Sequence, residues 1–124
     1  MFEIKTGNLF DNIEPLGIDG IFAPVYSHRY ILVNEYKNMP YHSEHYFEYN
    51  YHRDLSKKEC KEIYTSMLNA LVKVGAKRLA TYSLHLGDGH FIPGREKMIY
   101  IQEVLEEWYE RHKNKIEALY LFDF

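Results

Sequence analysis

The chain has 124 residues, of which 46% are hydrophobic and 27% charged, and its formal net charge is −3. This size and balance indicate one soluble globular domain spanning residues 1–124 and exclude a disordered segment. The slight acidic surplus argues against nucleic acid as a partner, and no apolar run reaches the length that a membrane span needs.

Four segments in the first half of the chain have the composition and patterning of strands. They are residues 1–5, 18–25, 29–36 and 45–52. The apolar run at 18–25 indicates a strand that is buried on both faces, in the interior of a sheet. The segment TGNLFDN, which follows the first strand, predicts a turn or a short helix.

The second half of the chain alternates between helical and extended patterns. Seven apolar residues recur with the spacing of a helix and predict one there: Cys60, Ile63, Tyr64, Met67, Leu68, Leu71 and Val72. Ser56 and Glu59 form a capping box for its start, and Gly75 is a typical C-terminal stop. A strand at 78–86, a helix at 97–113 and a strand at 118–124 follow, and the helix is marked by the apolar residues Ile101, Val104, Leu105 and Trp108. This alternation predicts parallel strands with helices covering the sheet.

The segment HLGDGHFIPG, residues 85–94, joins the 78–86 strand to the next helix. Ligands of open α/β sheets collect at the carboxyl ends of strands, where this loop is expected. Gly87 and Gly89 allow the backbone to approach a ligand closely, and the N-terminus of the following helix favours an anion. The pattern therefore predicts a phosphate-sized anion site, to which Arg95 would add a donor. The alternative is an ordinary glycine-rich turn between a strand and a helix.

Two parts of the sequence together resemble the macro domain family. They are MFEIKTGNLFDN…IDGIFAPV near the N-terminus and GAKRLATYSLHLGDGHFIP…IQEVLEEW…IEALYLFDF in the second half. The resemblance implies an α/β fold: a single three-layer macro-like domain with a mixed six-stranded sheet and few helices. It also implies binding of ADP-ribose or a related nucleotide, and some members of the family hydrolyse ADP-ribose esters.

The resemblance also assigns ligand-binding residues. Asn8 would lie beside the adenine, where many members place an aspartate that contacts the base. The diphosphate and the distal ribose would be cradled by Leu86, Gly87, Asp88, Gly89, His90 and Phe91.

This sequence departs from the family pattern at the first loop. Ala23 and Tyr26 stand where the family has two asparagines, and no glycine cluster follows them. In the second loop, Ile92 stands where a third glycine often occurs. We therefore expect a binding domain without hydrolase activity, and an ADP-ribosyl hydrolase is the minor alternative.

Three further features of the sequence suggest other chemistry. His42 and His45 would point to opposite faces of a strand, so we expect no metal site and no cofactor. Cys60 lies on the apolar face of a predicted helix, where core packing is the expected role. Asp88 would serve as a general base only if a substrate lay in the loop, whereas an aspartate between glycines commonly stabilises a turn.

The sequence leaves a second function open. It contains 12 tyrosines and 7 phenylalanines, many of them within residues 26–51. Tyrosine suits surfaces that are apolar on one side and wet on the other. That region would form a homodimer or partner-binding surface in a non-catalytic interaction module. The N-terminal residues show no secretory signal, so we expect a cytoplasmic protein of a cell, a virus or a mobile element.

Overall fold

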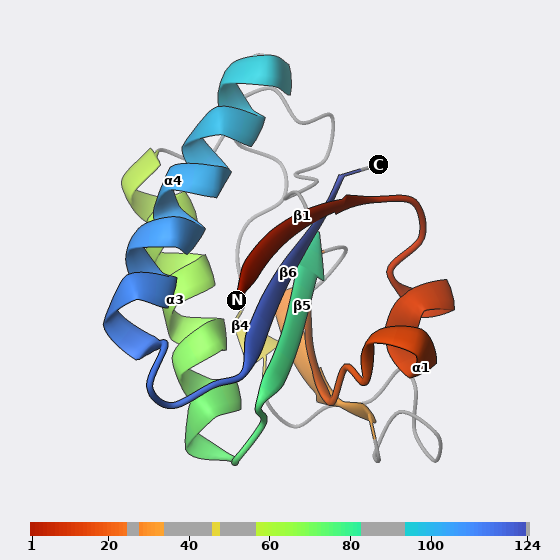
Figure 1. The fold of residues 1–124 in the computed structure, drawn as a ribbon. Helices are drawn as coiled ribbons and strands as arrows, with labels where there is room; N and C mark the ends of the chain where they lie inside the picture. The colour runs from red at the N-terminus through yellow and green to blue at the C-terminus, as the bar shows by residue number, and fades with distance from the viewer. Residues whose placement is uncertain (25–27, 34–45, 48–56, 83–93, 124) are drawn as a thin grey trace.

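A twisted sheet runs through the molecule with helices on both of its faces (Figure 1). The computed structural model describes residues 1–24, 28–33, 46–47, 57–82 and 94–123. The elements in chain order are β1 Phe2–Thr6, the 3-10 helix η1 Phe10–Asn12, α1 Ile13–Leu16, β2 Gly20–Pro24, β3 His28–Leu32, β4 Tyr46–Phe47, α3 Lys57–Lys73, β5 Arg78–Tyr82, α4 Gly94–His112 and β6 Ala118–Asp123.

The sheet has six strands in the order β1-β6-β5-β2-β3-β4. The first four strands of this order run parallel to one another, and β3 and β4 extend the sheet with antiparallel pairings. The expected α/β class and the mixed six-stranded sheet are therefore confirmed. Strands β5 and β6 are neighbours and pair in parallel from Arg78↔Ala118 to Tyr82↔Phe122, as the alternation of helices and strands predicts.

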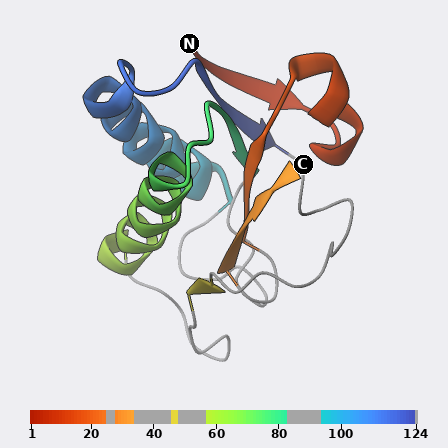
Figure 2. The same ribbon diagram turned by 90° about the horizontal axis from the view of Figure 1, so that it is seen from below.

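Strand β6 shows why both faces of the sheet must be covered. Its side chains alternate between two core clusters, because successive residues of a strand point to opposite faces. Leu119 and Leu121 belong to the cluster on the α3 and α4 side. Ala118, Tyr120 and Phe122 belong to the cluster on the α1 side. Figure 2 shows the sheet between these two groups of helices, which makes three layers.

Helices α3 and α4 cover one face with the apolar stripes that their sequences predict. Leu105 is fully buried and Trp108 is 4% exposed. The indole of Trp108 donates a hydrogen bond to Asn69 Oδ1 at 2.9 Å and stacks on His112. The expected packing of this helix against the sheet is confirmed. Helix α4 begins at Gly94, whereas the sequence predicted a start at residue 97. Its first turn precedes Met98, the first apolar residue that packs against the core, so the apolar pattern did not mark that turn.

The end of α3 is set by Gly75, as its sequence predicts. Gly75 has φ +92°, a conformation that favours glycine. Its N–H donates to Val72 O at 3.0 Å, and the N–H of Ala76 donates to Leu71 O at 3.0 Å. This is a Schellman motif, and it turns the chain directly into β5. The capping box predicted at Ser56 lies outside the described residues.

The short helices η1 and α1 cover the other face of the sheet. Their segment confirms the predicted break after the first strand. Leu9 is fully buried in the cluster on this face, and Ile13 and Leu16 pack against it. Gly17, with φ +63°, ends α1 and leads the chain into β2. The β1–β2 connection therefore lies on the opposite face from α3 and α4.

Candidate functional site

The carboxyl ends of the four parallel strands lie along one edge of the sheet. These ends are Thr6 of β1, Asp123 of β6, Tyr82 of β5 and Pro24 of β2. The register pairs Thr6 with Asp123 and Tyr82 with Phe122, so three strands end within one residue of a common line. Here we call this line the carboxyl edge.

The elements that come next after β1 and after β5 in the described chain lie on opposite faces of the sheet. After β1 it enters η1 and α1, whose cluster contains Leu9. The next described element after β5 is α4, which packs in the other cluster through Leu105 and Trp108. Strand β6 lies between β1 and β5 and ends at this edge. Ligands of open α/β sheets bind where neighbouring connections diverge in this way.

The turn that follows β1 places Gly7 and Asn8 at this edge. Gly7 has φ +102°, and both residues are exposed. Asn8 Oδ1 accepts the N–H of Phe10 at 2.8 Å, and Asn8 O accepts the side-chain amide of Asn12 at 2.7 Å. Among the described residues, the Nδ2 group of Asn8 donates no hydrogen bond. The role of Asn8 as a ligand-binding residue stays a prediction.

Most of the predicted loop lies outside the described residues. That applies to all six of its assigned ligand-binding residues, Leu86 to Phe91, whose role stays a prediction. The described chain resumes at Gly94, the first residue of α4. Since β5 ends at the carboxyl edge, the loop connects that edge to the start of α4. The side chain of Arg95 and most of the tyrosine-rich region 26–51 also lie outside the description.

Beneath the edge, Thr81 ties two strands together. It is fully buried, and its Oγ1 donates a hydrogen bond to Phe22 O at 2.9 Å. This satisfies a buried hydroxyl inside the sheet, one residue before β5 ends. Thr81 therefore supports the strand from which the predicted loop departs.

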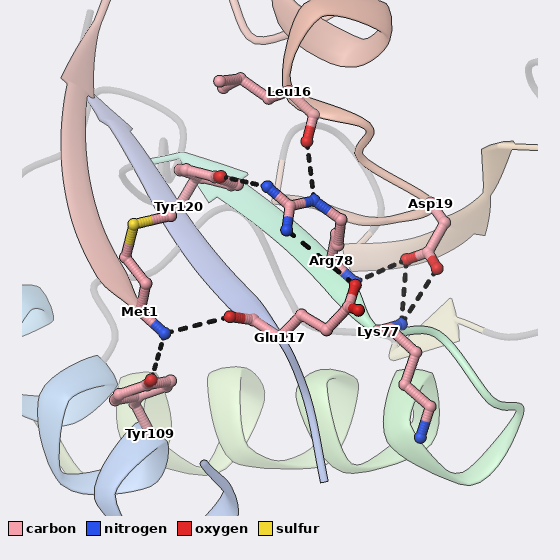
Figure 3. Close-up of polar contacts among 8 residues, drawn as sticks. All are labelled: Met1, Leu16, Asp19, Lys77, Arg78, Tyr109, Glu117 and Tyr120. Atoms are coloured by element: carbon pink, nitrogen blue, oxygen red, sulfur yellow. Dashed lines mark hydrogen bonds and ion pairs between the residues drawn. The ribbon is translucent and has the colours of Figure 1, made fainter. Parts of the chain in front are cut away.

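The opposite, amino edge of the sheet carries a polar network that sequence analysis did not predict (Figure 3). Asp19 precedes β2, and its carboxylate accepts the backbone N–H groups of Lys77 and Arg78 at 2.9–3.0 Å. The Arg78 guanidinium donates to Leu16 O at 2.8 Å and to the Tyr120 hydroxyl at 2.7 Å. The only signal in the sequence was an aspartate just before an apolar strand.

Two more contacts extend this network along the amino edge. Glu117, which precedes β6, lies 3.9 Å from the Arg78 guanidinium. The amino group of Met1 donates to the Tyr109 hydroxyl and to Glu117 O. These groups bind one another, so the network holds the strand starts together and serves stability.

One tyrosine of α4 has a perturbed pKa in the described part of the chain. Burial raises the pKa of Tyr100 on α4 above its ordinary value, and Cys60, Glu103 and Glu107 raise it further. Its hydroxyl is therefore neutral at physiological pH. Within the described ranges, no group of three or more His, Cys, Asp or Glu residues is placed to hold a metal ion. The histidines considered above, His42 and His45, lie outside those ranges.

Buried Cys60 packs in the core on the α3 and α4 side, as its sequence position predicts. No helix in the described part of the chain is both long and apolar enough to cross a membrane. In comparisons with known proteins, no family model matches the chain, and no curated protein matches it.

Proposed function

We propose that this chain is a small macro-like domain that binds a nucleotide or an ADP-ribose-type ligand at the carboxyl edge, without hydrolase activity. The observation that carries the proposal is the divergence of two connections around β6. The turn with Asn8 leaves toward one face, and the chain after β5 reaches α4 on the other face. The predicted glycine loop spans the second of these connections.

The spacing of the strands suits a ligand of this size. Strands β1 and β5 flank β6, so their ends are two strand spacings apart, or about 10 Å. An extended nucleotide diphosphate bridges that distance. One of its ends would meet Asn8, and its phosphates would meet the loop before Gly94.

The two sides of the edge offer different chemistry to such a ligand. Asn8 presents an amide that donates or accepts, which suits the polar edge of a base. The start of α4 presents backbone N–H groups that have no partner within the helix and a partial positive charge, which suit phosphate. With Gly87 and Gly89 in the loop before it, the backbone can approach the phosphate closely.

The test is isothermal titration calorimetry with ADP-ribose, NAD, cyclic nucleotides and phosphorylated sugars. We expect ADP-ribose or a close relative to bind the wild-type chain. Gly89→Val should abolish that binding, because its side chain would occupy the place of the phosphate, while the melting temperature falls little. A loop that serves only as a turn predicts the reverse: no binding to lose, and a destabilisation of about 1 kcal/mol or more from backbone strain.

A second variant examines the base end of the site. Asn8→Asp keeps the oxygen that accepts the Phe10 N–H, so the turn is preserved. If Asn8 faces adenine, the carboxylate accepts the adenine amino group and should raise affinity for ADP-ribose. Affinity for ribose 5-phosphate, which has no base, should stay unchanged and is the matched control. Equal effects on both ligands would place the base elsewhere.

A further inference from the structure

Strand β1 forms one end of the described sheet and has an open outer edge. It lies at the end of the strand order, and its described partner is β6. The C=O of Met1 accepts the N–H of Leu119 and so points toward β6. Backbone direction alternates along a strand, so Glu3 and Lys5 also point their N–H and C=O toward β6. The backbone groups of Phe2, Ile4 and Thr6 therefore point outward.

The side chains of β1 do not protect its outer edge against pairing with another strand. Ile4 is 45% exposed, although it lies on the α3 and α4 face opposite Leu121. On the other face, Glu3 and Lys5 form an ion pair at 3.0 Å, with 39% and 38% of their side chains exposed. Open backbone groups beside an exposed isoleucine are a template for pairing with another strand.

We propose that β1 pairs with β1 of a second copy of this chain, antiparallel and centred on Ile4. In this register Ile4 lies opposite Ile4 of the other copy, and Phe2 lies opposite Thr6. These residues carry the outward-facing backbone groups, so each of the three pairs exchanges two hydrogen bonds, about six in all. The two sheets would join into one continuous sheet across a two-fold axis.

The charges of Glu3 and Lys5 favour a second copy of this chain as the partner of β1, and they favour one register of the two strands. In the proposed pairing, Glu3 of each copy lies opposite Lys5 of the other, in the closer, non-hydrogen-bonded type of pair. A shift by two residues keeps the hydrogen-bonding pattern but places Glu3 opposite Glu3, or Lys5 opposite Lys5. Like charges directly opposite are destabilising. The short sequence FEIKT is therefore complementary to itself in one register.

The experiment is sedimentation equilibrium of the wild-type chain over a range of protein concentrations, with charge reversals. We expect a monomer–dimer equilibrium. Glu3→Lys places two lysine side chains opposite each other at both symmetry-related positions, and should weaken association about tenfold. Lys5→Glu should do the same with two glutamates. The double variant Glu3→Lys/Lys5→Glu restores the opposite charges and should restore the wild-type dimer.

The control is Glu62→Lys, which makes the same change of net charge as Glu3→Lys, at an exposed position on α3. It should leave association unchanged, and circular dichroism should show that every variant is folded. A monomer mass for the wild type up to about 1 mM would overturn the proposal. So would a double variant that stays as weak as the single ones. Its net charge equals that of the wild type, so damage to β1 rather than lost charge pairing would then explain the weaker association.

Discussion

The two edges of the parallel strands are built differently. At the amino edge, the residues that precede the strands bind one another: Asp19 binds the backbone of Lys77 and Arg78, and Arg78 lies beside Glu117. At the carboxyl edge, the described residues after β1 are an exposed glycine with positive φ and an exposed asparagine. The difference shows that polar contacts tie the strand starts together at the amino edge, while the carboxyl edge is where we propose that a ligand binds.

Removal of the Asp19 carboxylate should have the largest effect on stability. Asp19→Ala leaves the N–H groups of Lys77 and Arg78 without their acceptor, and should lower the free energy of unfolding by about 3 kcal/mol. Chemical denaturation measures this. Asp11→Ala, at an exposed aspartate of η1, is the control and should cost less than about 0.5 kcal/mol. Equal losses in both variants would mean that the amino edge does not carry the stability assigned to it.

A smaller effect is expected from Gly20, at the start of β2. A Cβ there would lie 2.8 Å from the Ala76 Cβ and 3.0 Å from Leu71 Cδ2, which is too close. Gly20→Ala should therefore cost about 2 kcal/mol through overpacking. Ala76→Gly removes the closest atom, so the double variant should cost less than the two single costs added. Additive costs in a double-mutant cycle would contradict this account of close packing between α3 and β2.

The smallest effect is a pH dependence from Tyr100. Its pKa is raised in the folded chain, so above about pH 10 the unfolded chain loses this proton more readily than the folded one. Ionisation of Tyr100 in the unfolded chain therefore lowers the free energy of unfolding as the pH rises above about 10, and it has no effect at lower pH. Denaturation at pH 9 and pH 11 should show a larger alkaline loss for the wild type than for Tyr100→Phe. A loss of the same size in both chains would assign the alkaline effect to other groups.

Sequence patterns predicted the elements that depend on local spacing. The stripe containing Leu105 and Trp108 predicted α4, and Gly75 predicted the end of α3 because its φ is required there. The apolar run of β2 predicted an interior strand, and β2 does lie between β5 and β3. Each of these signals is contained within a few neighbouring residues.

Contacts between distant segments were beyond this kind of prediction. Nothing around Asp19 indicates that its carboxylate meets Lys77 and Arg78, which lie 58 and 59 residues away. The exposed edge of β1 depends likewise on its pairing with β6 at the other end of the chain. Of the candidate site, Asn8 is placed at the carboxyl edge, while the binding role of residues 86–91 stays a prediction.

The most direct test of the carboxyl-edge site is a map of amide chemical shifts by NMR during titration with ADP-ribose. We expect shifts at the amides of Gly7, Asn8 and Gly94 and at those of residues 83–92. The amides of Lys77 and Arg78, at the amino edge, should stay unchanged and serve as the internal reference. Shifts confined to the amino edge, or no shift at saturating ADP-ribose or related nucleotides, would contradict the proposed binding site.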